Sequence, residues 1–433
     1  MDEIFHVPQA QRYCNGYFSE WDPKITTFPG LYGLSAFLSG LTSILLGFEG
    51  TCSLMALRAV NAVLGAGTLL VMYGLLRRRM TSDKAAAQAL VLSLYPVHFF
   101  FAFLYYTDVG SVFWVLLTHH FATPSPGQAL PGFWSILAAT CSGFVSIAFR
   151  QTNAVWIMFT FGTAALADLQ ASKHWSDDLR GSGLTRKMLW TFVKALVLDS
   201  GRLLSRLGLL LVPVLLFVAF VIWNGSVVVG DHSHHKPVLH WAQLCYVSAV
   251  AASLWGVVGP DAAVSPLNVK AFVAMFTQNW RTALATVTSM VGTAWMLHRY
   301  SFVHPFLVAD NRHYTFYVWG RLLGKIPGLK EAIAPAYVYA AWLCHRHSTQ
   351  AQSTLWFLIW CVAVILTVVP AHLLEPRYWT TAVLLLHLHA PERSWASLVV
   401  SALVCLAVNC MTLAIFVGRA FTWPDGSIAR FMW

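Results

Sequence analysis

Two adjacent carboxylates near the start of the sequence are the first residues whose types favour acid–base chemistry. Asp2 and Glu3 precede His6, and Trp21 with Asp22 lies in the next polar stretch. Neighbouring side chains on a helix or strand point in different directions, so only one of the two carboxylates can face a given substrate atom. This favours a single general base. The simpler interpretation, which the sequence alone leaves open, is a solvated acidic terminus.

A second set of candidates closes the apolar run that ends at Leu104. Tyr105 belongs to an aromatic pair, and Asp108 follows it three residues later. An acid beside aromatics at a helix end can orient a base or hold a sugar hydroxyl. Thr107 or Asp108 can equally cap the next helix, and the two interpretations are compatible.

Three arginines lie beside aromatic residues at predicted membrane boundaries. They are Arg150, Arg312, which His313 follows, and Arg377. A planar guanidinium binds phosphate through two hydrogen bonds. Any one of them can instead be an arginine that reaches to the membrane interface. Three such arginines on one side of the membrane favour a phosphate site.

The remaining polar motifs give weaker signals. Residues 231–235 contain one Asp and three His, which are common metal ligands. Ligands so close together in one loop rarely complete a site, so we expect an exposed polar loop and no metal. Neither a Walker loop nor a G-x-G-x-x-G string occurs, which disfavours a soluble nucleotide donor. No C-x-x-C spacing occurs either, although Cys14 and Cys52 could bridge in an oxidising lumen.

Composition restricts what can position these residues. Of the 433 residues, 57% are hydrophobic and only 11% are charged, whereas soluble domains are about one-quarter charged. This predicts an integral membrane protein and excludes a disordered chain or a small disulfide scaffold. The net charge of +10 comes from short basic clusters between apolar runs, as the positive-inside rule expects, so no nucleic-acid partner is predicted.

Apolar stretches near spanning length predict an all-α polytopic membrane protein with roughly 11–13 membrane segments. They occupy residues 30–48, 54–76, 85–104, 109–121, 132–149, 154–167, 203–223, 238–258, 282–298, 332–345, 353–373, 378–390 and 395–418. The chain has no internal repeat, and we expect a single domain over 1–433. Within it, residues 1–53 form a first loop with an interfacial segment, and 54–433 form a helical bundle with short loops.

The positions of basic residues predict which loops share a side. If 30–48 lies in the membrane interface, the helix over 54–76 ends at the three arginines of 77–79 on the cytosolic side. The loops at 168–190, 259–281, 346–352 and 391–394 then follow it there. The opposite side receives residues 1–28, 105–108, 150–153, 224–236, 304–325 and 375–378, which include all the candidate residues above.

These strings together resemble one family, the dolichyl-phosphate-glucose-dependent α-1,2-glucosyltransferases of the endoplasmic reticulum. The resemblance runs over nearly the whole chain in order. It rests on the strings at residues 1–6, 8–14, 21–27, 29–32, 104–107, 149–153, 309–319, 375–378 and 430–433. Members of the family carry a membrane helix before the first of these strings, whereas this sequence starts at the string, so we expect a truncated sequence.

The resemblance implies a GT-C type lipid-phosphate-sugar glycosyltransferase with a luminal active site. The donor would be dolichyl phosphate β-glucose, and the acceptor a dolichyl-diphosphate-linked oligosaccharide that already carries two glucoses. The β donor and α product imply inversion in one displacement, without metal or other cofactor. Asp2 would be the base, with Glu3 the competing candidate.

The other implied roles fall into two groups. Asp108, His6, Tyr105 and Trp21 would bind or orient the acceptor, and Arg150, Arg312, His313 and Arg377 would bind the donor phosphate.

Three other functions remain open from the residues alone. A polytopic transporter or channel is the main alternative, although the marked charges lie mostly at segment ends rather than at mid-membrane depth. A related enzyme that uses dolichyl-phosphate mannose is the second. A noncatalytic membrane subunit is the third.

Overall fold

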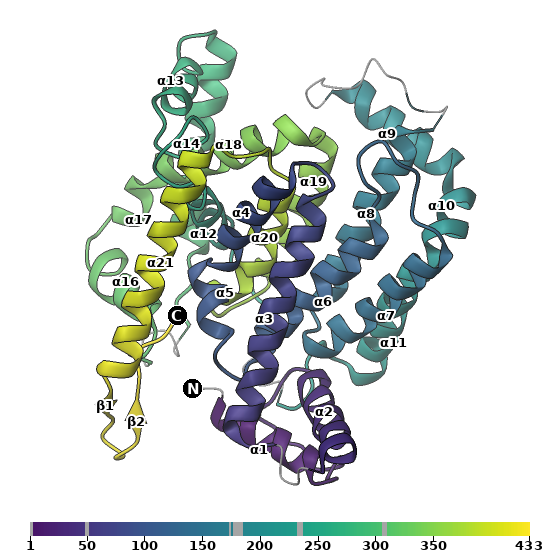
Figure 1. Cartoon of the computed structure of the whole chain (residues 1–433). Coiled ribbons are helices and arrows are strands. Elements are labelled where there is room, and N and C mark those ends of the chain that lie inside the picture. The colour runs from purple at the N-terminus through teal and green to yellow at the C-terminus, as the bar shows by residue number, and fades with distance from the viewer. Residues whose placement is uncertain (1–2, 48–51, 173–174, 176–184, 232–236, 305–309) are drawn as a thin grey trace. The chain divides into compact units, whose positions relative to one another are not determined.

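The computed structural model describes residues 3–47, 52–172, 175, 185–231, 237–304 and 310–433, and these are mostly helical (Figure 1). The chain divides into two compact units. The first comprises Met1–Met80, Phe101–Lys236 and Ser353–Ala363. The second comprises Thr81–Phe100, Pro237–Gln352 and Val364–Trp433.

The first unit contains ten helices among its described residues, besides the start of α19. They are α1 (Glu3–Cys14), α2 (Gly30–Leu46), α3 (Leu54–Leu76), α6 (Thr107–Ala122), α7 (Phe133–Phe149), α8 (Asn153–Gln170), α9 (Arg186–Leu198), α10 (Ser200–Leu207), the short 3-10 helix η2 (Gly208–Leu210) and α11 (Leu211–Asn224). Helix α3 begins where Ser53 accepts a hydrogen bond from the Ala56 amide, as an N-cap does.

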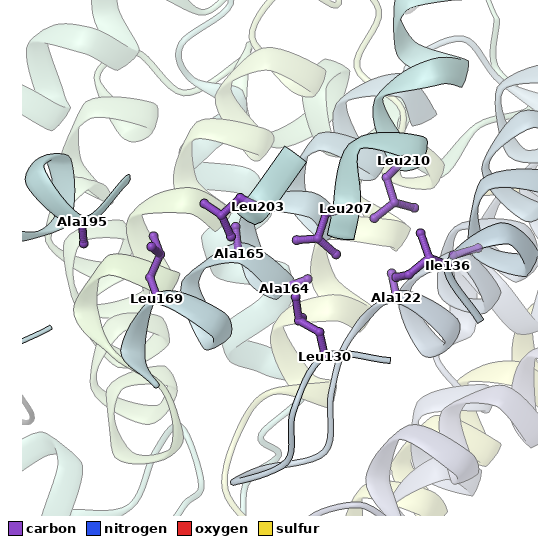
Figure 2. Close-up of a cluster of buried hydrophobic side chains, with 11 residues drawn as sticks. Ala122, Leu130, Ile136, Ala164, Ala165, Leu169, Ala195, Leu203, Leu207 and Leu210 are labelled. Atoms are coloured by element: carbon purple, nitrogen blue, oxygen red, sulfur yellow. The ribbon is translucent and has the colours of Figure 1, made fainter. Parts of the chain in front are cut away.

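Small and branched apolar side chains fill the core of the first unit. One cluster brings Ala164, Ala165 and Leu169 of α8 against Leu203 and Leu207 of α10 (Figure 2). Alanines at these positions let the helix backbones approach closely, which is the usual way that helices pack within a membrane.

The second unit contains the remaining elements. They are α4 (Ser82–Ser93), α5 (Pro96–Phe101), α12 (Gln243–Ser253), α13 (Pro266–Ala274), α14 (Trp280–Tyr300), α16 (Tyr314–Val318), the π-helical turn η3 (Trp319–Leu323), α17 (Leu329–Ala332), α18 (Ala334–Ala351), α19 (Thr354–Val368), η4 (Pro376–Trp379), α20 (Thr380–Leu388), α21 (Trp395–Gly418), and the antiparallel strands β1 (Phe421–Thr422) and β2 (Ile428–Ala429). Helix α5 lies in the second unit except for its last residue, Phe101, which belongs to the first unit. Helix α19 runs from the first unit into the second after Ala363.

Apart from this short hairpin, the chain is an all-helical membrane protein, as the composition predicted. Three helical stretches within the described residues are long and apolar enough to cross a membrane: Leu54–Leu76, Ser200–Asn224 and Trp395–Gly418. Only 17% of the apolar window in Ser200–Asn224 is buried. Its exposed side chains include Ile222 and Trp223, and such a large exposed apolar surface suits lipid. Four shorter apolar helices accompany them.

The predicted run over 85–104 is the clearest local difference. It forms two helices, α4 and α5, because Pro96 lacks an amide proton and cannot continue α4. The bounds of α3 and α21, by contrast, coincide with the predicted 54–76 and 395–418.

Candidate active site

Glu3 is a buried carboxylate of the first unit that three hydrogen bonds hold. Its two oxygens accept hydrogen bonds from Arg58 Nε at 2.9 Å and Nη2 at 2.7 Å. Glu3 Oε1 also accepts from the Tyr105 amide at 2.7 Å. The Glu3 side chain is only 8% exposed. Glu3 therefore ties the start of α1 to α3 and to the segment before α6, and both of its oxygens are already engaged.

Asn61 lies about one helical turn beyond Arg58 on α3 and holds the segment before α6. Its Nδ2 donates to the Leu104 and Tyr106 carbonyls at 2.6 and 2.7 Å. Arg58 and Asn61 are three residues apart, so they lie on one face of the helix. Asn61 fixes residues 104–106 directly. Arg58 binds Glu3, which in turn accepts a hydrogen bond from the Tyr105 amide of this segment.

Asp2 lies outside the described residues, so the structure does not describe the proposed base itself. Its neighbour Glu3 is nevertheless fixed by three hydrogen bonds. In Figure 1, α1 and α2 lie together at one end of α3.

His6 belongs to a cluster of aromatic rings beside this anchor. Its Nδ1 is 2.5 Å from the Tyr32 hydroxyl, and its ring contacts that of Tyr106 edge-on. Tyr13 and Trp21 pack against Tyr32 with centroid separations of 5.9 and 5.8 Å. Offset or edge-on aromatic pairs of this kind rigidify a site.

Trp21 is the ring of this cluster that stays partly exposed. Gln9 on α1 fixes its position from both sides, because the Gln9 amide donates to the Glu20 carbonyl and accepts from the Asp22 amide. The Trp21 indole nitrogen donates to the Ile25 carbonyl at 3.1 Å. Trp21 therefore keeps a partly open ring available to a sugar.

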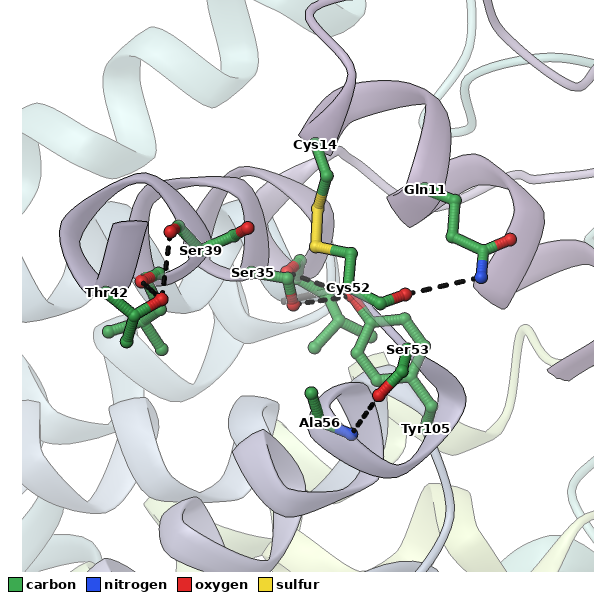
Figure 3. The surroundings of a disulfide bond; sticks show 11 residues. Gln11, Cys14, Ser35, Ser39, Thr42, Cys52, Ser53, Ala56 and Tyr105 are labelled. Carbon is green, nitrogen blue, oxygen red and sulfur yellow. Dashed lines mark hydrogen bonds between the residues drawn. A yellow bond between two sulfur atoms is a disulfide. The ribbon is translucent and has the colours of Figure 1, made fainter. Parts of the chain in front are cut away.

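Tyr105 has a different environment from the one its predicted role requires. Its ring is fully buried, and its hydroxyl lies 2.7 Å from Ser35 Oγ and donates to the Leu31 carbonyl (Figure 3). No ring face is left on which a sugar could stack. Tyr105 instead joins α2 to the segment that Asn61 holds.

A disulfide between Cys14 and Cys52 joins the end of α1 to the residues before α3 (Figure 3). The Gln11 amide also donates to the Cys52 carbonyl. This pairing was one possibility that the sequence left open. The disulfide attaches the last residue of α1 to the segment before α3, whereas Glu3 attaches the first residue of α1 to α3.

Asp108 and Arg150 form an ion pair of 2.9 Å. Asp108 lies in the first turn of α6 and Arg150 caps the end of α7. The predicted phosphate ligand Arg150 is therefore paired with a carboxylate, and the predicted acceptor residue Asp108 orients a guanidinium.

Loops predicted to share a side contact one another within the first unit. The Val229 and Asp231 amides donate to the Thr26 and Pro23 carbonyls, and the Gln151 side chain donates to Thr26 as well. Asp231 thus supports the first loop. The histidines at 232, 234 and 235 lie outside the described residues, and no potential metal-binding group of three His, Cys, Asp or Glu occurs among those described.

The second unit brings Arg312 and His313 together around Asp310. Arg312 Nε and Nη2 donate to the two Asp310 oxygens at 2.8 and 2.5 Å, and His313 Nε2 lies 3.5 Å from Asp310 Oδ2. Burial alone would raise the pKa of Asp310, but the hydrogen bonds from Arg312 and His313 outweigh it and hold the pKa well below its usual range.

Glu375 and Arg377 add a second local ion pair at the start of η4. The pKa of His313 is raised above its ordinary value. Burial opposes its charge, but the hydrogen bond to Asp310 and the charges of Glu375 and Asp310 outweigh burial. We call Asp310, Arg312, His313, Glu375 and Arg377 the arginine–histidine cluster.

Sequence reasoning missed the residues that hold these sites: Arg58, Asn61, Tyr32 and Gln9 in the first unit, and Trp423 and Trp433 in the second. Arg58 and Asn61 did carry a signal, because polar residues inside an apolar run are costly in a membrane and usually have a function. The others have contacts distant in sequence that no local pattern shows.

Comparison with known proteins gives one consistent family. A family model described as the DIE2/ALG10 family matches residues 1–388. Relatives named Dol-P-Glc:Glc(2)Man(9)GlcNAc(2)-PP-Dol alpha-1,2-glucosyltransferase include one from Mus musculus, 34% identical over 100% of this chain and 93% of its own. One from Homo sapiens is 32% identical over the same shares, and one from Arabidopsis thaliana is 31% identical over 100% and 94%. No solved structure matches the chain.

Proposed function

Because the chain belongs to the DIE2/ALG10 family, we propose that it transfers glucose from dolichyl phosphate glucose to a dolichyl-diphosphate-linked oligosaccharide that carries two glucoses. The new bond is an α-1,2 linkage, as the names of the relatives state for those proteins. The reaction takes place on the luminal side of the endoplasmic reticulum membrane, in a GT-C type fold.

The observation that carries the mechanism is the fixed start of α1. Both Glu3 oxygens are engaged by Arg58 and by the Tyr105 amide, so Glu3 acts as an anchor. Asp2, the residue before it, is then the general base that takes the proton of the acceptor 2-hydroxyl. A base works only when held within hydrogen-bond reach of that proton, and the anchor supplies this constraint.

The arginine–histidine cluster binds the donor phosphate. Guanidinium groups pair with phosphate through charge-assisted hydrogen bonds, and they stabilise the charge of the leaving dolichyl phosphate. Since that leaving group departs as an anion, the reaction needs neither a general acid nor a metal ion. A β-linked donor and an α-linked product make the single displacement inverting.

In the first unit, Trp21 offers a partly exposed ring to the acceptor and His6 a hydrogen-bonding group next to it. Arg150 is paired with Asp108 at 2.9 Å, as Arg312 and Arg377 are paired with Asp310 and Glu375, so each of the three arginines would bind phosphate in competition with its carboxylate. Asp108 accordingly orients Arg150.

The test is transfer by the purified full chain in lipid vesicles, with labelled dolichyl phosphate glucose and the diglucosylated acceptor. The expected product carries one more glucose, released by a glucosidase specific for terminal α-1,2 linkages, and forms equally with a metal chelator present. Dolichyl-phosphate mannose should not compete. Transfer of mannose instead, or solute counterflow in the absence of any transfer, contradicts the proposal.

A further inference from the structure

The segment after α21 folds back onto the arginine–histidine cluster. Strands β1 and β2 pair antiparallel, with Phe421 opposite Ala429. Residues beyond β2 then run beside residues 312–314. The Met432 amide donates to the Arg312 carbonyl at 2.9 Å, and the Tyr314 amide donates to the Met432 carbonyl at 3.1 Å. This segment, residues 419–433, lies beyond the range that the family model matches, and we call it the tail.

Tail side chains also contact the cluster directly. The Arg312 guanidinium lies 4.7 Å from the centre of the Trp423 ring, a distance at which a cation is attracted to an aromatic face. The Trp423 indole nitrogen donates to Asn311 Oδ1 at 3.1 Å. Trp433 packs edge-on against Tyr314 with a centroid separation of 5.1 Å. Met432 is almost fully buried, so the tail is packed in place rather than lying loosely on the surface.

The His313 imidazole is held between the tail and Asp310. Its Nδ1 lies 2.8 Å from the Trp433 main-chain oxygen, and its Nε2 faces the Asp310 carboxylate. The Trp433 oxygen can only accept, so Nδ1 carries a proton, and the carboxylate 3.5 Å from Nε2 favours a proton there as well. The surroundings therefore favour the doubly protonated, positively charged imidazole.

The protonation state of His313 decides the net charge of the five side chains in the arginine–histidine cluster. Arg312 is balanced by Asp310, and Arg377 is balanced by Glu375. With a neutral His313 the five side chains sum to zero, and with a protonated His313 they sum to one positive charge. Protonation of His313 therefore adds one positive charge that favours an anionic phosphate.

We propose that the tail is a working part of the donor site, because it positions the Arg312–His313 backbone and accepts the hydrogen bond that keeps His313 charged. The proposal rests on the proposed function, in which the cluster binds the donor phosphate. His313 and Arg312 are binding residues in this account, and Met432 and Trp433 are positioning residues.

The sign of the pH dependence follows from this arrangement. The charged and titratable groups that face His313 are Asp310, Arg312, Glu375 and Arg377, and the tail adds the Trp433 oxygen. The raised pKa of His313 extends its protonated form to higher pH than an ordinary histidine. The KM for the donor should therefore stay constant at low pH and rise as the pH passes through this raised pKa. Without the tail the rise should begin at a lower pH, nearer the ordinary pKa of about 6.5.

The experiment compares donor and acceptor KM between pH 6 and 8.5 for the full chain and three variants. One variant lacks residues 432 and 433, and the second carries Met432→Pro, which removes the amide that donates to Arg312. The third, Ile428→Ala, is a control on an exposed tail side chain. The first two should raise the donor KM more at pH 7.5 than at pH 6, and leave the acceptor KM unchanged. Ile428→Ala should match the full chain.

Two further variants separate the tail from the donor site itself. His313→Arg carries a permanent charge, so it should flatten the pH profile and reduce the effect of the shortened tail. If His313→Asn raises the donor KM while the tail variants leave the KM and its pH profile unchanged, the tail proposal is overturned and the donor site stands. If the tail variants raise the donor KM and the acceptor KM equally at every pH, the tail has only a structural role and the tail proposal is also overturned. If His313→Asn and Arg312→Met leave the donor KM unchanged, the proposed donor site itself fails.

Discussion

The Glu3–Arg58 pair, which we call the anchor, and the arginine–histidine cluster both combine carboxylates with arginines, but in opposite ways. Glu3 and Arg58 are 55 residues apart in sequence, and their pair joins two helices. In the cluster each carboxylate pairs with an arginine only two residues away, and the tail makes the long-range connection through its backbone. A long-range ion pair joins distant parts of the chain, whereas a local pair constrains only its own segment.

Among the variants that compare the two regions, the largest effect on transfer should follow from removing the guanidinium of the anchor. Arg58→Met leaves Glu3 buried without its partner, which costs about 2–4 kcal/mol, below the full range for buried pairs because Arg58 is 30% exposed. Displacement of α1 should lower kcat about a hundredfold. Thermal unfolding and transfer assays measure both effects, and the exposed pair of Arg12 with Glu20 supplies the control variant Arg12→Met. Equal behaviour of Arg58→Met and Arg12→Met would mean that Glu3 is not an anchor.

A cluster variant should show the opposite pattern. Arg312→Met removes charge-assisted hydrogen bonds to the donor phosphate and should raise the donor KM roughly ten- to a hundredfold. Its thermal midpoint should fall less than that of Arg58→Met, because His313 still faces the Asp310 carboxylate. Arg321→Met, on an exposed arginine near Tyr317, is the matched control. A large loss of stability with an unchanged donor KM would remove the distinction between the two regions.

A smaller effect is expected one turn along α3. Asn61→Leu loses the two donors that hold residues 104–106, which should cost about 1–3 kcal/mol in the free energy of unfolding and reduce kcat less than Arg58→Met does. Thr68→Val, on the same helix, is the control, since Thr68 bonds only to the Leu64 carbonyl of its own helix in the described contacts. A kcat loss with Asn61→Leu as large as with Arg58→Met would place Asn61 in direct contact with substrate.

The smallest effect on transfer should come from the disulfide. Cys14→Ser with Cys52→Ser removes one attachment of α1 but leaves the Glu3 anchor, so the thermal midpoint should fall while the transfer rate below that midpoint stays unchanged. Calorimetry with a parallel transfer assay measures this. Inactivation of the double variant at a temperature where it remains folded would show that the anchor does not suffice to position α1.

Local sequence patterns predicted the helices but not their connections. The bounds of α3 and α21 followed from uninterrupted apolar runs, because the 20-residue length and the absence of proline decide them locally. Pro96 lay inside a predicted run and divides it, which the proline rule alone could have shown. The candidates Arg312 and His313 do cluster around Asp310, since the three are neighbours in the chain.

The partners of those candidates could not be predicted in the same way. The pairing of Glu3 with Arg58, of Asp108 with Arg150 and of His313 with Trp433 depends on how helices pack. Tyr105 shows the same limit, because an aromatic residue at a helix end can be buried or exposed with equal local sequence. Its burial depends on α2, which covers it.

The central claim is that Glu3 anchors the first loop while Asp2 reacts, and steady-state kinetics of two isosteric variants test it most directly. Asp2→Asn should lower kcat about a thousandfold, within the range that general-base catalysis supplies, with an unchanged thermal midpoint and donor KM. Glu3→Gln keeps the shape but only one of the two acceptor oxygens, so it should lower the thermal midpoint and reduce kcat by less than about tenfold. The reverse result, a silent Asp2→Asn and an inactive but fully stable Glu3→Gln, would contradict the account and make Glu3 the base.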